Sequence, residues 1–210
     1  MYKKKFFFIV FEGVEGTGKS YQINKLYNNL IKKKIATIKT REPGGSNSAE
    51  LIRNLIFDKK FSKFDKLTDF YLMLASRNEH LLNTIIPAKK KKIVVISDRF
   101  TDSTYAYQVV GNKIDRKINF LNQKYITGNL KPNLTIILKS NFKIIKSRLK
   151  KRKNKNKFDK LNYKIYEKIQ KAFINLATRN KKNYNLYDSS KNNNELEKEI
   201  FNLVYGKISK

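Results

Sequence analysis

Short apolar segments alternate along the chain with longer segments whose apolar residues recur at helical spacing. Apolar runs of about four to eight residues are typical of buried strands, and helical spacing is typical of helices with one buried face. The predicted strands are 6–11, 36–39, 93–97, 133–138 and 183–187. The predicted helices are 19–33, 48–57, 66–88, 115–128, 142–151, 161–182 and 193–205.

This alternation predicts an α/β fold, a three-layer sandwich in which a five-stranded parallel sheet is covered by helices on both faces. A length of 210 residues suits one domain with a sizeable core, so residues 1–210 are predicted to form a single unit. No repeat and no Ser/Pro/Gly-rich linker divides the chain. The segment KKRKNKNK, 150–157, has no apolar residue and predicts a solvated, mobile loop between two helices.

The composition excludes several kinds of site. The chain has no cysteine, which excludes disulfides and cysteine-based zinc sites, and its one histidine, His80, cannot form a metal site alone. The apolar run 6–11 follows three lysines, as in a signal peptide, but it is short and ends in Glu12 and Gly13. No apolar stretch approaches the roughly 20 residues that cross a bilayer. We therefore expect a soluble, cytoplasmic protein.

The formal charge of +30, from 47 basic and 17 acidic residues, has two interpretations. Lys/Arg-rich surfaces bind nucleic acids through counterion release. Alternatively, the charge reflects codon drift, because Lys, Asn, Ile, Phe and Tyr have A/T-rich codons and lysine is spread over the whole chain. We favour drift over a nucleic-acid partner. In either case a positive field attracts anionic substrates such as nucleotides.

The segment GVEGTGKS, 13–20, matches the phosphate-binding loop pattern G-x-x-x-x-G-K-[ST] at every position and lies between a predicted strand and a predicted helix. Glycines allow backbone N–H groups to turn towards phosphate oxygens, and the positive end of the following helix adds to the attraction. Lys19 is expected to reach the β- and γ-phosphates. The predicted nucleotide-binding residues are Gly13, Val14, Glu15, Gly16, Thr17, Gly18, Lys19 and Ser20.

A metal site is predicted beside this loop. Asp98 ends the apolar segment IVVISD, and the carboxyl edge of a parallel sheet is where nucleotide and metal ligands gather. The hydroxyl of Ser20 is the expected second ligand of Mg²⁺.

The segment NKID, 112–115, resembles the base-recognition motif of small GTPases. Such proteins also need an Asp-x-x-Gly segment, and no aspartate of this chain is followed by glycine three positions later. The preceding residues, DSTYAYQVV, suit a helix better than a buried strand. We therefore interpret NKID as a coincidence in a chain rich in Lys and Asn.

Three further stretches carry arginines that suit an anionic acceptor. Arg41 follows the second predicted strand and would lie beside the phosphate-binding loop if that strand neighbours the first. Arg77 lies on a long predicted helix, and Arg99 follows Asp98. Arginines that face one cleft need anions or a base carbonyl, so together they predict a site for a nucleoside monophosphate. The stretches are TREPGG (40–45), ASRNEH (75–80) and DRFTDSTYAYQ (98–108).

In this order, FEGVEGTGKS, TREPGG, LMLASRNEH, SDRFTDSTYAYQ and KPNLTIIL cover nearly the whole chain, and with them the sequence resembles the thymidylate kinase family, which are P-loop nucleoside monophosphate kinases. The resemblance implies a P-loop NTPase fold with a basic lid at about 148–161. It also implies the reaction ATP + dTMP → ADP + dTDP, with ATP and Mg²⁺ as cofactors, and a homodimer that binds no membrane. In the family, the stretch after AYQ is a Gly-rich turn followed by Ile-Asp, which accounts for NKID.

The resemblance also implies residue roles in the acceptor site. Arg41 and Arg99 would hold the dTMP phosphate. Arg77 and Gln108 would bind the thymine ring, with help from Thr104. The remaining members of the implied site are Glu42 and Arg53, which line the pocket, and Tyr107, which crowds the ribose 2′ position.

Two features depart from the family pattern. Met73 stands where an aromatic ring stacks on thymine, and a core role and a pocket role both remain open for it. The P-loop carries Glu15 and no arginine, so the lid must supply cations. There Lys157 replaces the family's arginine, and Arg148 or Arg152 could supply the planar contact that lysine cannot make. The alternatives are a kinase for another pyrimidine nucleoside monophosphate and a basic, nucleic-acid-binding P-loop ATPase.

Overall fold

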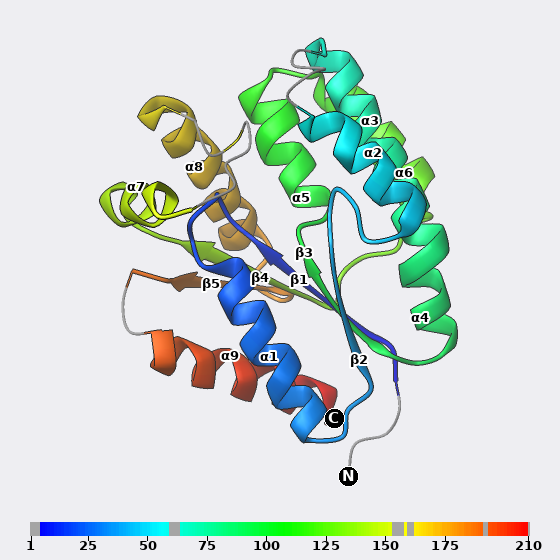
Figure 1. Cartoon of the computed structure of the whole chain (residues 1–210), viewed down its shortest axis with the longest axis vertical. Coiled ribbons are helices and arrows are strands. Elements are labelled where there is room, and N and C mark those ends of the chain that lie inside the picture. The colour runs from blue at the N-terminus through cyan, green and yellow to red at the C-terminus, as the bar shows by residue number, and fades with distance from the viewer. Residues whose placement is uncertain (1–4, 59–63, 153–157, 159–161, 191–192, 210) are drawn as a thin grey trace.

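A computed structural model describes residues 5–58, 64–152, 158, 162–190 and 193–209 (Figure 1). These residues form one parallel sheet of five strands in the order β2-β3-β1-β4-β5. The strands are β1 (Phe7–Glu12), β2 (Thr37–Arg41), β3 (Val94–Asp98), β4 (Leu134–Lys139) and β5 (Tyr184–Asp188). The predicted α/β sandwich and its parallel five-stranded sheet are confirmed.

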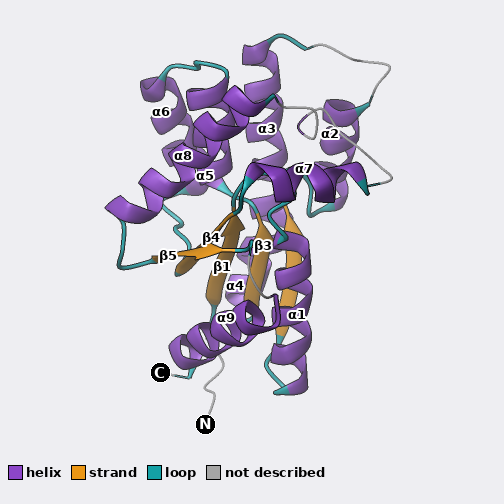
Figure 2. Ribbon diagram, turned by 90° about the vertical axis from the view of Figure 1, so that its left-hand side faces the viewer, coloured by secondary structure: helices purple, strands orange, loops and turns teal. Residues whose placement is uncertain are grey.

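Helices cover both faces of this sheet (Figure 2). The α-helices are α1 (Lys19–Lys32), α2 (Asn47–Phe57), α3 (Lys66–His80), α4 (Ile86–Lys90), α5 (Thr101–Thr104), α6 (Arg116–Thr127), α7 (Phe142–Lys150), α8 (Tyr163–Arg179) and α9 (Asn193–Ile208). Two segments are π-helical, η1 (Leu81–Ile85) and η2 (Tyr105–Gly111). The residues before NKID are thus helical, as predicted, because α5 and η2 occupy them.

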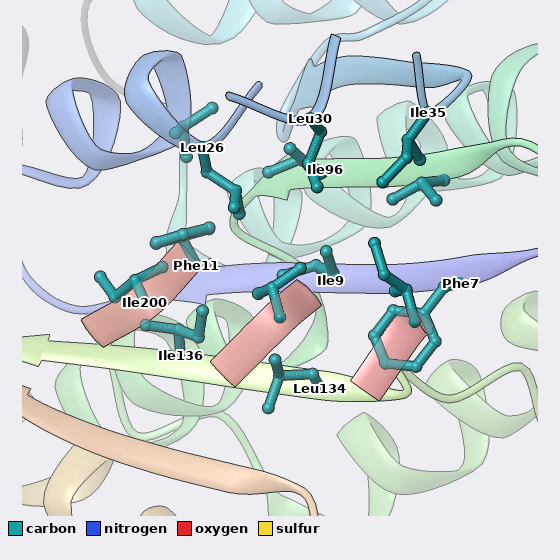
Figure 3. Packing of buried hydrophobic residues seen from close by; sticks show 14 of the residues in the cluster. Phe7, Ile9, Phe11, Leu26, Leu30, Ile35, Ile96, Leu134, Ile136 and Ile200 are labelled. Atoms are coloured by element: carbon teal, nitrogen blue, oxygen red, sulfur yellow. The ribbon is translucent and has the colours of Figure 1, made fainter. Parts of the chain in front are cut away.

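The core lies on both sides of β1, whose six residues are all buried. Alternate side chains of a strand point to opposite faces. Phe7, Ile9 and Phe11 pack with α1 and α9, where Leu26 and Ile200 meet them (Figure 3). Phe8 and Val10 lie in the cluster on the other face with residues of η1 and α4. A strand buried on both faces explains why 6–11 is continuously apolar.

The predicted helix over 66–88 is present, but its hydrogen-bond pattern changes part-way along. The chain continues as a helix from Lys66 to Lys90, but α3 and α4 are separated by the π-helical η1. Pro87 has no backbone N–H and its ring crowds the carbonyl one turn earlier, so regular α-helical bonding cannot run through this position. The wider π turn accommodates that break.

The order of the strands changes the position expected for Arg41. β2 pairs with β3 and not with β1, so β3 separates Arg41 from the strand that leads into the P-loop. The chain then crosses from β3 to β4 on the other side of β1. In open α/β sheets, ligands bind where the connections diverge, outside the carboxyl ends of the strands. The carboxyl ends of β1 and β3 therefore define the site.

Candidate active site

The phosphate-binding loop connects the carboxyl end of β1 to the first turn of α1. Gly13 has φ of 133°, and a Cβ placed there would lie 2.2 Å from the backbone oxygen of Leu138. Only glycine fits this approach between neighbouring chain segments. The Thr17 hydroxyl donates to the Val14 carbonyl at 2.8 Å and closes the loop. The sequence therefore folds here into the turn that precedes a helix N-terminus, a common site for phosphate.

Lys19, the first residue of α1, is buried under the loop. Its Nζ donates to the carbonyl oxygens of Gly13 and Val14, at 2.9 and 3.0 Å. Burial, together with the nearby positive charge of Arg99, lowers the pKa of Lys19 to about 8. A lysine held this way gains a strong partner when phosphate oxygens enter the loop.

Ser20 and Asp98, the two predicted metal ligands, lie together. The Ser20 hydroxyl donates to Asp98 Oδ2 at 3.2 Å. Asp98 Oδ1 is buried and has no hydrogen-bond partner within the described residues. Among the residues that the structure describes, no three acidic or histidine side chains form a group that could hold a metal ion. A hydroxyl beside an unsatisfied carboxylate oxygen suits Mg²⁺, which takes one or two protein ligands and completes its shell with phosphates and water.

Arg99 is the cation that joins the loop to the neighbouring cavity. It has φ of 78°, an uncommon conformation for a non-glycine residue. Its Nη2 donates to Glu15 Oε1 at 2.8 Å, and its guanidinium lies over the Tyr107 ring, 5.1 Å from the centroid. The Tyr107 hydroxyl donates to the other oxygen of Glu15. Although burial opposes it, Arg99 lowers the pKa of Glu15, so the P-loop glutamate stays ionised.

Glu12, which the sequence analysis did not assign, fixes the backbone around Arg99. Its carboxyl accepts from the backbone N–H groups of Phe100 and Ser103 at 2.8 and 3.2 Å and from the Ser103 hydroxyl at 2.6 Å. Burial and the nearby Asp102 raise the pKa of Glu12 to about 8. A lone acidic residue at the end of an apolar strand was its only signal in the sequence.

Arg77 is committed to partners within the protein. Its Nε donates to Glu42 Oε2 at 2.7 Å, and its Nη1 donates to Thr104 and Gln123 at 2.9 and 2.8 Å. Its Nη2 donates to the Phe100 carbonyl at 2.9 Å. The resemblance implied a direct contact with thymine. The structure places Arg77 at the cavity wall, where its guanidinium organises Glu42 and Thr104.

Arg41 and Arg53 lie on the other side of the cavity, around Glu50. Arg41 donates to both oxygens of Glu50, from Nε at 3.1 Å and from Nη2 at 2.9 Å, and is more than half exposed. Arg53 Nη1 donates to the Pro43 carbonyl at 2.6 Å and its guanidinium lies over the Phe57 ring. An acceptor phosphate would have to compete with Glu50 for Arg41, a competition that was not predicted from the sequence.

These side chains surround one cavity of about 480 Å³. The predicted site residues that line it are Glu15, Gly16, Gly18, Lys19, Ser20, Arg41, Glu42, Arg53, Met73, Arg77, Asp98, Arg99, Thr104, Tyr107, Gln108, Arg148 and Arg152. Gly13, Val14 and Thr17 do not line the cavity and instead support the loop beneath it. Met73 is buried and also lines the cavity, so its core role and its pocket role coincide.

The lid is only partly within the described residues. Arg148, on α7, donates to the carbonyl oxygens of Gly16 and Ser189 at 3.2 and 3.0 Å, which places this cation against the P-loop. Arg152 lines the cavity. Lys157 lies outside the described residues. The aromatic ring of Phe158 lies 5.1 Å from the Tyr107 ring, at the cavity wall.

Several side chains of the site were not predicted from the sequence. Phe57 and Phe158 line the cavity, and Gln123 holds Arg77 from α6. Ser103, within the DRFTDSTYAYQ motif, connects Glu12 to Arg99 because its hydroxyl donates to Glu12 and accepts from Arg99 Nη1 at 2.8 Å. Phe57, four residues after Arg53, could have been found from helical spacing, since such pairs share a helix face.

Comparison with known proteins gives a consistent assignment. The family model described as thymidylate kinase matches residues 11–200. The chain belongs to the thymidylate kinase family. It is 34% identical to a thymidylate kinase of Mycoplasma capricolum over 96% of this chain and 95% of that protein. A thymidylate kinase of aster yellows witches'-broom phytoplasma is 37% identical over 96% of each chain.

The fold agrees with that membership. The crystal structure of a thymidylate kinase from Ehrlichia chaffeensis superposes with a TM-score of 0.77 and 27% identity, and covers 96% of this chain and 99% of that one. In the part of the chain that the structure describes, no helix is long and apolar enough to cross a membrane. The P-loop and the arginine-rich cavity therefore belong to a kinase of the thymidylate kinase family.

Proposed function

We propose that the chain transfers the γ-phosphoryl group of ATP to dTMP, giving ADP and dTDP. One observation carries the proposal: Lys19 and Ser20 of the P-loop and Arg99 of the acceptor side line the same cavity. Two nucleotides bound from the two sides would meet at Arg99. Its side chain already bridges P-loop Glu15 and Tyr107, which the family resemblance assigns to the acceptor ribose.

The proposed mechanism is positioning and neutralisation of charge. Lys19 binds the β- and γ-phosphates, and Arg99 holds the acceptor phosphate in line. Ser20 and Asp98 would hold Mg²⁺, which neutralises charge on the phosphates of ATP. The attacking phosphate oxygen of dTMP is already anionic, so no general base is required. Arg148 lies against Gly16 and adds positive charge where the transferring group would pass.

Acceptor recognition is assigned to the side of the cavity away from the P-loop. Thr104 and Gln108 are buried side chains at the cavity wall, and Met73 supplies an apolar, polarizable surface for the base. Tyr107, held by Glu15, would crowd a ribose 2′-hydroxyl and favour a deoxynucleotide. Residues 1–210 are proposed to act as a single kinase domain.

The experiment that tests this function is an ADP-release assay with ATP, Mg²⁺ and dTMP, dUMP, UMP or dCMP as the acceptor. We expect turnover with dTMP to exceed turnover with each other nucleotide. Preference for dUMP or UMP would replace the proposal with the kinase for another pyrimidine nucleotide. Absence of turnover with every monophosphate would reject the kinase and favour the nucleic-acid-binding ATPase.

We also propose that the chain acts as a homodimer. Helices α3 and α6, which pack against one another, expose large apolar side chains. A water-soluble monomer rarely leaves many such groups uncovered on neighbouring helices. The exposed residues are Leu67, Tyr71, Ile118, Phe120, Leu121 and Tyr125.

A further inference from the structure

His80, the one histidine of the chain, has no role in the mechanism above. It lies at the end of α3 and is fully buried. Its Nδ1 is 2.9 Å from Glu42 Oε1 and its Nε2 is 2.7 Å from Thr40 Oγ1. Both ring nitrogens therefore have partners that lie on β2 or directly after it.

The chemistry of these partners assigns the protons. Although burial opposes it, Arg77 and the hydrogen bond from His80 lower the pKa of Glu42, so its carboxylate can only accept. Nδ1 of His80 must then carry the proton and donate. The Thr40 hydroxyl, which faces Nε2, can donate or accept, and in the neutral Nδ1–H tautomer it donates to Nε2.

The second oxygen of Glu42 connects the hydrogen bonds of His80 to the cavity. Oε2 accepts from Arg77 Nε, and Arg77 Nη2 lies 2.7 Å from the same oxygen. Arg77 Nη1 then donates to the Thr104 hydroxyl at 2.9 Å. Glu42, Arg77 and Thr104 line the cavity, whereas His80 does not. A continuous set of hydrogen bonds thus connects a buried imidazole to the acceptor side of the site.

We propose that His80, as the Nδ1–H tautomer, is a positioning residue that orients Glu42 and, through it, Arg77 and Thr104 for the acceptor nucleotide. The inference rests on the proposed function, because the affected ligand is the dTMP of that reaction. His80 reaches the cavity only through Glu42, and neither of its partners is a P-loop residue. Its loss should therefore affect dTMP more than ATP.

Two amide substitutions distinguish the role of Nδ1 from the role of Nε2. The amide nitrogen of asparagine in His80→Asn lies near the place of Nδ1 and can still donate to Glu42. The longer amide of His80→Gln lies near the place of Nε2 and leaves Glu42 without that donor. We expect His80→Gln to raise KM for dTMP about tenfold, the size of one lost hydrogen bond to a charged group, with KM for ATP within about twofold. We expect His80→Asn to stay within about threefold of the wild type.

The matched control is Thr37→Val, which removes another buried hydroxyl bond, to the Ile35 carbonyl, at the opposite end of β2. It should leave both KM values unchanged. Equal kinetics for the wild type and His80→Gln would overturn the proposal. Equal losses in both His80 variants, with KM for ATP also raised, would show a structural role only and would overturn it as well.

A measurement on the wild type avoids any failure of the variants to fold. With one histidine in the chain, long-range ¹H–¹⁵N correlation of ¹⁵N-histidine-labelled protein reports a single imidazole. We expect the pattern of the Nδ1–H tautomer; an Nε2–H pattern would overturn the proposal. If the wild type fails to phosphorylate dTMP, the proposed function fails, while the tautomer still tests this geometry. If the wild type is active and His80→Gln matches it, the inference alone fails.

Discussion

Burial controls the charge of Glu12, immediately before the P-loop. Its pKa is raised from 4.5 to about 8 by burial and then by Asp102. An acid with a raised pKa favours the folded state at low pH, and that contribution is lost as the pH rises through the folded value. We expect the melting temperature of Glu12→Gln to increase relative to the wild type between about pH 5 and pH 8, because glutamine does not ionise. Thermal unfolding of both proteins across this range measures the effect, and a constant difference would contradict it.

The positive charge of Lys19 also depends on pH, and its loss should weaken the binding of ATP. Burial and Arg99 lower its pKa to about 8 in the free protein, so its positive charge is lost as the pH rises through that value. We expect the affinity for ATP in the absence of dTMP to fall above about pH 8. Lys19→Ala should lower turnover by about a hundred- to a thousandfold and leave dTMP binding largely intact. Calorimetry measures the affinity for each nucleotide, and a steady-state kinase assay measures the turnover. An unchanged pH dependence of ATP binding in Lys19→Ala would assign the titration to another group.

Residues that act within one contiguous loop could be predicted from the sequence, and residues that act through distant partners could not. The P-loop pattern identified Lys19 and Ser20 because their geometry follows from a local strand, turn and helix. Arg77 lines the cavity, but its partner Gln123 is 46 positions away on α6. Arg41 was expected at a phosphate, and although Glu50 is only nine positions away, their pairing depends on the turn that joins β2 to α2.

At the level of elements, the segment NKID, which resembles a guanine-binding motif, ends in the residue that caps helix α6. Asp115 is the N-cap of α6, and its Oδ1 accepts from the backbone N–H groups of Lys117 and Ile118 at 2.8 and 3.0 Å. We expect Asp115→Ala to lower the free energy of unfolding by about 1 kcal/mol, the usual effect of losing an N-cap. Asp115→Asn, which keeps an acceptor oxygen, is the matched control. Denaturant unfolding measures the stability of both variants. If Asp115→Ala changed the preference between ATP and GTP, the GTPase interpretation of NKID would be restored.

The strands and most helices could be predicted because their apolar patterns are local. The order of the strands could not be predicted, because a continuously apolar segment carries no information about which strand it will pair with. The π-helical segments also escaped prediction. η2 begins at Tyr105, within the DRFTDSTYAYQ stretch, and brings Tyr107 and Gln108 to the cavity wall, so the irregular helix there serves the site.

At the scale of the whole molecule, the exposed apolar residues of α3 and α6 predict self-association. Leu121 is 54% exposed on α6, and Ile31 is 44% exposed on α1, which covers the opposite face of the sheet (Figure 1). We expect Leu121→Glu to shift the protein from dimer to monomer and Ile31→Glu to leave the dimer intact. Light scattering after gel filtration measures the mass. A wild-type monomer at micromolar concentration would contradict the proposed dimer.

The charge of +30 belongs to the whole chain, and it has consequences for every anionic ligand. A diffuse positive field accelerates the encounter with nucleotides, and salt screens it within about 8–10 Å at physiological ionic strength. We expect kcat/KM for ATP and for dTMP to fall as salt rises, with kcat nearly constant. A selected nucleic-acid site would add several phosphate contacts at once, so its affinity would fall steeply, as a high power of the salt concentration. Filter binding of DNA and RNA from about 50 to 200 mM salt separates the two. Weak binding with a shallow slope supports codon drift as the origin of the charge, whereas tight binding with a steep slope would establish a nucleic-acid partner beside the kinase.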